Sequence, residues 1–190
     1  MNLRADRTAF LAFVLSAGAA FAQGPATVPP SSELGVPPPP SAAPHLEFAF
    51  EFRVTLAPAV VVGDTLFGRR QFIGITGGTI AGPKFKGEVM AGGWDYQLIT
   101  TQGCASLSAD YFVRAADGTV IHVLNEGINC ASSGERSFFR PRFEAPKGPH
   151  DWLTRSTFFA TLELERSELA ANNGAPPPLR AIRLKFYQVK

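Results

Sequence analysis

The sequence is poor in the residue types that mark several large classes of protein site. It has two cysteines and three histidines, and the spacing of His45, His122 and His150 is not that of a ligand set. Because a zinc site needs three or four converging donors, we expect no metal. There is also no G-K-S/T phosphate loop, nucleophile elbow or dinucleotide fingerprint, so no cofactor is expected either.

An excess of charge of one sign is also missing. The chain has 18 basic and 16 acidic residues. A nucleic-acid-binding domain concentrates basic side chains on one face, and the short runs Arg69–Arg70 and Arg140–Arg142 are too small to do this. Nucleic acid is therefore not an expected partner.

Long hydrophobic runs are absent, but a short one begins the chain. Arg4 and Arg7 precede the apolar stretch Ala9–Ala20, and an A-x-A pattern ends at Ala22. This layout predicts a secretory signal peptide over residues 1–22. The alternative is a membrane anchor, which needs about 20 apolar residues. We expect a periplasmic or secreted protein with no membrane span after cleavage.

Prolines cluster in the next segment, residues 23–44, which contains few side chains that could build a core. Such a composition predicts an extended, solvated linker. It serves either as a plain spacer or as a ligand for a protein-recognition domain. The folded domain is then expected over residues 45–190, which is long enough for one core of ordinary size.

Strand patterns dominate this domain. In Leu46–Leu56 apolar and polar residues alternate, and Phe158–Leu164 and Ile182–Phe186 show the same period of two. Only Ser167–Asn173 resembles a helical turn. Many short strands with glycine turns and little helix predict an all-β fold. We expect a single closed or nearly closed antiparallel β-barrel of lipocalin-like size, because closure removes exposed strand edges.

Asp117-Gly118 is a signal for a two-residue hairpin turn. Pairing about this turn sets Asp110 opposite Asn125, and it brings Cys104 close to Cys130 at the open end of the hairpin. In an oxidising compartment two such cysteines predict a disulfide. The alternative is a pair of buried free thiols.

The glycine-rich segment "FGRRQFIGITGGTIAGPKFKGEVMAGGWDYQL" lacks the helix that a phosphate-binding loop needs, so its glycines are expected to form turns, bulges and close backbone contacts. The segment resembles the signature of domain-of-unknown-function family 3237, also known as uncharacterised protein family 0311. "SADYFVRAADGTVIHVLNEG", "FFRPRFEAP", "DWLTRSTFFATLEL" and "FYQV" follow in the same order. The resemblance covers nearly all of Leu46–Val189 and implies a closed β-barrel of mostly unassigned function.

The resemblance also implies a set of family-like positions. This sequence departs from the family at His122, where tyrosine is usual, and at Asp110, where arginine is common. The positions that match are Gly77, Gly78, Thr79, Gly87, Glu88, Gly92, Gly93, Asp95, Gln97, Tyr111, Asn125, Gly127, Arg140, Phe143 and Trp152.

Glu88 and Asp95 flank the turn Ala91–Gly93, so we expect their carboxylates to lie near each other. If both point inward, burial and repulsion would raise one pKa and produce a general acid or base. Arg140 would supply a fixed positive charge. The alternative is that these acids form ordinary ion pairs with arginines on a strand face.

A binding pocket is predicted inside the barrel. Its aromatic side chains either line the pocket or belong to an ordinary core. Two functions are carried forward: binding of a small molecule, and acid–base catalysis by a hydrolase, lyase or isomerase through Glu88, Asp95 and Arg140. The predicted ligand-binding residues are Trp94, Gln97, Tyr111, His122, Asn125 and Trp152.

Overall fold

The computed structural model describes residues 39, 41, 43–130, 137–166 and 179–190. The chain divides into two units, residues 1–42 and 43–190, and the described strands all belong to the second unit. The predicted signal peptide and most of the predicted linker lie outside the described residues, and so does the segment Ser167–Asn173. No helix in the described ranges is long and apolar enough to cross a membrane.

The described part of the second unit is built almost entirely of antiparallel strands, which alternate between buried and exposed residues as the sequence predicts. The elements are β1 (Leu46–Thr65), β2 (Gly68–Ala81), β3 (Gly87–Val89), β4 (Trp94–Ile99), β5 (Cys104–Ala115), β6 (Val120–Cys130), β7 (Phe138–Glu144), α1 (Trp152–Arg155), β8 (Phe158–Arg166) and β9 (Leu179–Val189).

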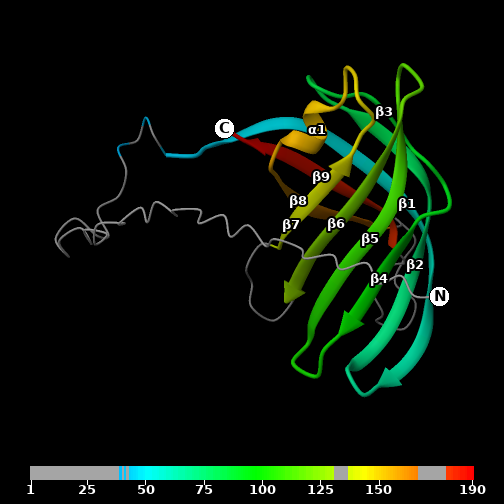
Figure 1. The fold of residues 1–190 in the computed structure, drawn as a ribbon. Coiled ribbons are helices and arrows are strands. Elements are labelled where there is room, and N and C mark those ends of the chain that lie inside the picture. The colour runs from blue at the N-terminus through cyan, green and yellow to red at the C-terminus, as the bar shows by residue number, and fades with distance from the viewer. Residues whose placement is uncertain (1–38, 40, 42, 131–136, 167–178) are drawn as a thin grey trace, which may run out of the picture. The chain divides into compact units, whose positions relative to one another are not determined.

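These strands close into a ring (Figure 1). The order β1-β9-β8-β7-β6-β5 continues through β3 and β4 to β2, which pairs with β1 again. The short β3 and β4 follow one another between β5 and β2, and each pairs with both. The predicted antiparallel β-barrel with little helix is therefore confirmed.

The passage from β3 to β4 is not the hairpin turn that the sequence suggests. Glu88 lies opposite Arg114 and Asp95 opposite Ala109, so both short strands run in the same direction along β5. Gly92 has φ of 108°, a left-handed conformation that lets the chain bulge without reversing. The expectation that Glu88 and Asp95 face each other across a turn is wrong.

The β5–β6 hairpin differs from the predicted register by one residue. Its loop spans three residues, because the Ala115 N–H donates to the Thr119 oxygen and Gly118 takes φ of 91°. Asn125 therefore lies opposite Ala109, and Asp110 lies opposite Leu124. A slip of one residue reverses which face each side chain occupies, so the predicted pairing of Asp110 with Asn125 is wrong.

The same register places Cys104 directly opposite Cys130, with their Cα atoms 4.1 Å apart. The two sulfurs form a disulfide, as predicted. It ties β5 to β6 at the end of the hairpin far from its loop.

The interior has two halves of different composition. One half is filled by an aromatic cluster around Phe50, whose ring centroid lies 5.0 Å from that of Phe186 and 5.3 Å from that of Phe52. Helix α1 covers this half and buries Leu153 completely. The aromatic cluster comprises Phe50, Phe52, Phe85, Phe143, Trp152, Phe158 and Phe186.

Candidate functional site

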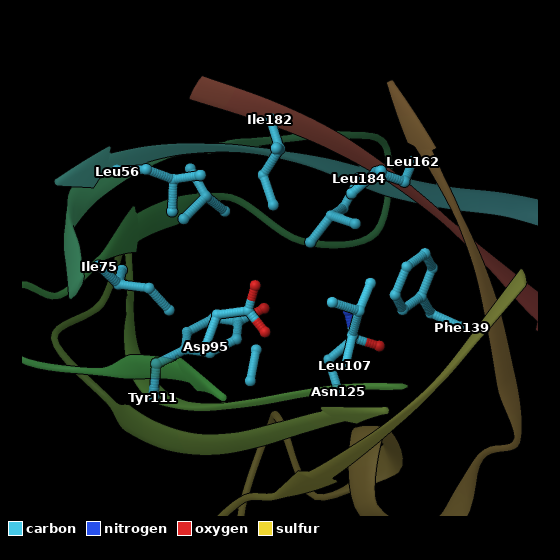
Figure 2. Close-up of a pocket in the computed structure, with 12 residues that line it drawn as sticks. Leu56, Ile75, Asp95, Leu107, Tyr111, Asn125, Phe139, Leu162, Ile182 and Leu184 are labelled. Atoms are coloured by element: carbon cyan, nitrogen blue, oxygen red, sulfur yellow. The ribbon is translucent and has the colours of Figure 1, made fainter. Parts of the chain in front are cut away.

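The other half of the interior contains an open-mouthed pocket (Figure 2). The cavity itself measures about 30 Å³. All the empty space between its walls, including the part that is open to solvent, amounts to about 410 Å³. Inward-facing side chains from β1, β2, β4 and β5 to β9 form its wall. They are Val54, Leu56, Ile75, Asp95, Leu107, Ala109, Tyr111, Asn125, Phe139, Leu162, Ile182 and Leu184.

Asp95 is the acidic side chain in this wall. Figure 2 shows its carboxyl group directed toward the middle of the ring of apolar side chains, with Ile182 and Leu184 on the facing wall. Burial raises the pKa of Asp95 to about 6, although a hydrogen bond from Gln97 opposes that shift. A carboxyl group with such a pKa can exchange a proton near neutral pH.

Three polar atoms in the pocket are buried and have no hydrogen-bond partner among the residues that the structure describes. They are Oδ1 of Asp95, the hydroxyl oxygen of Tyr111 and Oδ1 of Asn125. Tyr111 is 1% exposed and Asn125 is 3% exposed, and burial together with the nearby Asp95 charge raises the pKa of Tyr111. Most buried polar groups in folded proteins are paired, so three unpaired atoms in one cavity point to an absent partner.

Gln97 holds the other carboxyl oxygen of Asp95. Its Nε2 donates to Oδ2 at 2.7 Å, and its own Oε1 accepts from Nε2 of Gln71 at 2.7 Å. Gln71 lies directly opposite Gln97 in the β2–β4 ladder. The predicted site residues Asp95, Gln97, Tyr111 and Asn125 are thus brought together, and Gln71 joins them.

Two glycines let the walls of this site approach one another. A Cβ on Gly93 would lie 2.3 Å from Cβ of Tyr111, so only glycine allows the start of β4 to pass so close to β5. A Cβ on Gly127 would lie 2.5 Å from the ring of Phe139, which rests against the bare backbone. Glycine in a strand often marks such a close approach.

The structure does not bring Glu88 and Arg140 to Asp95. Glu88 points outward and pairs with Arg114 at 3.2 Å, and its side chain is 61% exposed. Arg140 is exposed and lines a separate groove where β7 and β8 diverge beyond the pairs Phe138–Thr161 and Phe139–Ala160. The three residues predicted as one catalytic group therefore lie in three different surroundings.

Three predicted ligand-binding residues also lie away from the pocket. His122 is on the outer face, where its Nε2 lies 2.7 Å from Oδ1 of Asp110. Trp94 is 41% exposed and packs over Gly74. Trp152 belongs to the aromatic cluster under α1.

Sequence reasoning missed Gln71 and most of the apolar wall. The alternation of β2 does place Gln71 on the same face as Ile73 and Ile75, which are both buried. That pattern could have assigned Gln71 to the inside. Among the described residues, no group of three or more histidine, cysteine, aspartate or glutamate side chains is arranged to hold a metal ion.

Comparison with known proteins assigns this fold and sequence to one family. Residues 44–189 match the sequence profile of DUF3237, described as a protein of unknown function. A UPF0311 protein of Clostridium acetobutylicum is 31% identical over 76% of this chain and 94% of its own length. A hydroalkoxylation enzyme of Penicillium herquei is 27% identical over 77% of this chain and 85% of its own length.

Solved structures show the same architecture. A β-barrel-like protein from Acinetobacter baumannii superposes with a TM-score of 0.64 at 24% identity, covering 82% of this chain and 99% of that one. An enzyme from Penicillium herquei superposes with a TM-score of 0.59 at 25% identity, covering 83% of this chain and all of that one (100%).

Proposed function

The chain belongs to the DUF3237 family, and we propose that it binds a small, largely apolar molecule carrying a hydroxyl group in the open half of its barrel. Either Asp95 or Asn125 can accept the one hydrogen bond that this hydroxyl donates, and Tyr111 can donate one to the hydroxyl oxygen. The apolar wall would enclose the rest of the molecule. A few convergent polar groups in an apolar cavity are typical of small-molecule sites.

The single observation that carries this proposal is the set of three buried oxygen atoms that have no partner within residues 43–130, 137–166 and 179–190. Each unpaired buried group destabilises a fold by about 1–3 kcal/mol, and a bound hydroxyl would relieve part of that cost. The cavity of about 30 Å³ has room for little more than one or two water molecules. A ligand therefore occupies the mouth as well as the cavity, and small molecules are favoured.

The test compares phenol with toluene, which have nearly the same shape but differ in the hydroxyl group. Binding is followed by amide chemical shifts in an NMR titration. We expect phenol to bind about tenfold more tightly than toluene, because only phenol has a hydroxyl group that can donate to one buried oxygen and accept from Tyr111. Tyr111→Phe should reduce this preference, whereas Gln102→Leu, at an exposed loop position, should keep it. Equal binding of both compounds would contradict the proposal.

Acid–base catalysis at Asp95 is the second candidate. Two observations favour it: the pKa of about 6 at a carboxyl group facing a pocket, and the sequence similarity to a hydroalkoxylation enzyme. Hydroalkoxylation adds the O–H bond of an alcohol across a carbon–carbon double bond. In such a step Asp95 would take the hydroxyl proton while the C–O bond forms, and would return a proton to the other carbon of the double bond.

A simple probe for this activity is 2-allylphenol, which carries both groups and cyclises without a change of mass. Cyclisation would be followed by chromatography. We expect turnover by the unmodified protein and by Gln102→Leu, and loss of at least 100-fold in Asp95→Asn, the usual scale for removing a general base (about 10²–10⁴-fold). Turnover that survives in Asp95→Asn would remove Asp95 from the chemistry.

We also propose that the protein acts outside the cytoplasm, in the periplasm or after secretion. The signal-peptide layout of residues 1–22 supports this, and so does the Cys104–Cys130 disulfide, since disulfides persist in oxidising compartments. N-terminal sequencing of protein from the producing cell should begin at Gln23. A mature protein that begins at Met1 would contradict export.

A further inference from the structure

A row of three side chains leads from the pocket to the rim of the barrel. Nε2 of Gln71 donates to Oε1 of Gln97, and Nε2 of Gln97 donates to Oδ2 of Asp95, each at 2.7 Å. All three side chains lie on the inner face of the adjacent strands β2 and β4, with Gln71 opposite Gln97. The other carboxyl oxygen, Oδ1, faces the pocket and has no partner in the described part of the chain.

The direction of these hydrogen bonds is set by the charge of Asp95. An ionised carboxylate can only accept, so Gln97 must turn its NH₂ group toward Asp95. Its Oε1 then faces Gln71, which must present an NH₂ group in turn. If the Gln97 amide rotated by half a turn, its oxygen would face Asp95, and only the protonated carboxyl group could donate to it.

We propose that Gln71 is a positioning residue: it fixes the orientation of the Gln97 amide, which in turn holds Asp95 as a carboxylate with Oδ1 turned toward the ligand. This proposal rests on the function proposed above, in which Asp95 accepts a hydrogen bond or a proton from the ligand. Gln71 is not among the residues that line the pocket, and its hydrogen bond goes to Gln97, so it is expected to act through Gln97.

Few charged groups face Asp95. Tyr111 on β5 is the other titratable side chain in the described pocket wall, and its raised pKa leaves it neutral at physiological pH. Asn125 on β6 is uncharged. The remaining walls from β1, β2, β7, β8 and β9 contribute apolar side chains. The amide row is therefore the principal polar influence on the Asp95 carboxyl group.

The experiment measures the titration of the Asp95 side-chain carbon by carboxyl-detected NMR, without any ligand. Gln97→Leu removes the direct hydrogen bond, Gln71→Leu removes its support, and the double variant removes both. Gln102→Leu, at an exposed loop position, is the matched control. The unmodified protein, the two single variants and the double variant form a cycle that separates an effect passing through Gln97 from one that reaches Asp95 by another route.

We expect Gln97→Leu to raise the pKa of Asp95 by about 1, since a hydrogen bond to a charged group is lost. Gln71→Leu should raise it by about half as much, because the freed Gln97 amide can turn its oxygen to the protonated carboxyl group. In the double variant Gln71→Leu should add nothing to the effect of Gln97→Leu. A merely structural role for Gln71 would not produce this dependence.

The proposal is overturned if Gln71→Leu leaves the pKa of Asp95 unchanged, or if its effect is the same with and without Gln97. Because the titration uses no ligand, these outcomes do not depend on the pocket's function. Failure of the proposed function would appear separately, as equal binding of phenol and toluene by the unmodified protein.

Discussion

The closed half of the barrel around Phe50 and the open half around Asp95 are built on the same strands, but different side chains fill them. Phe50 is fully buried and packs against six other aromatic rings with centroids within 6.5 Å. Asp95 lies among aliphatic side chains with one carboxyl oxygen unpaired. One half maximises packing, and the other leaves polar groups unsatisfied.

This difference separates the half of the barrel that stabilises the fold from the half that contains the proposed binding site. A dense aromatic core stabilises the ring of strands, so that the opposite end can tolerate a cavity, a buried acid and two further unpaired oxygens. Functional sites often violate the rules that stabilise a fold, and the rest of the structure compensates for them. The two halves should therefore respond differently to substitution.

The largest expected difference comes from removing one buried phenylalanine from each half. Phe50→Ala should lower the free energy of unfolding by about 4 kcal/mol, because it opens a cavity in the aromatic cluster. Phe139→Ala should lower it by about 2 kcal/mol, since Phe139 borders an existing pocket that water can enter. Urea denaturation measures both values. Equal losses would show that the two halves are packed alike.

The disulfide tests how the open half is held together. Replacing both Cys104 and Cys130 by serine should lower the free energy of unfolding by about 3 kcal/mol, because the bridge closes a loop with a sequence separation of 26. The measurement is urea denaturation under non-reducing conditions. Mass spectrometry of the unmodified protein should show two hydrogens fewer than the free dithiol, and the full hydrogen count would contradict the bridge.

Asp95→Asn should stabilise the protein, in contrast to substitutions in the closed half. The folded pKa of Asp95, about 6, lies above its usual 3.8, so the unfolded chain loses its proton first as the pH rises. Stability therefore falls between these two values and stays lower above pH 6. The variant should gain up to about 3 kcal/mol at pH 7 and nothing below pH 3.8.

Thermal unfolding across this pH range measures the effect of Asp95→Asn. Glu126→Gln, at a partly exposed position on the outer face, is a control that should not reproduce the pH dependence. A gain for Asp95→Asn that is the same at every pH would show that burial of the charge is not its cause.

The smallest expected effect is that of Glu88→Gln. Its ion pair with Arg114 is exposed, and such pairs contribute little to stability, so the midpoint of thermal unfolding should move by less than about 2 °C. Binding of phenol should be unchanged. Loss of binding in this variant would show that Glu88 contributes to the site. It would also weaken the contrast between the outer face and the open half.

The strand pattern alone did not determine which predicted residues reach the pocket, because bulges and loop lengths also decide which face a side chain occupies. Asp95 and Tyr111 lie inside, as the site hypothesis required, but Glu88 lies outside because the chain bulges at Gly92 and does not turn back. Asn125 faces inward only because the β5–β6 loop has three residues. An Asp-Gly pair fits loops of either length, so the sequence left this register open.

The sequence by itself determined the alternating strands, the scarcity of helix and the cysteine pair, because these follow from local periodicity and spacing. Only the tertiary structure decided which carboxyl group is buried and which residues meet in the pocket. These depend on bulges and loop lengths, where a shift of one residue exchanges the inner and outer faces of a strand at little local cost. Gln71, Gln97 and Asp95 form one row because β2 and β4 are adjacent in the closed ring.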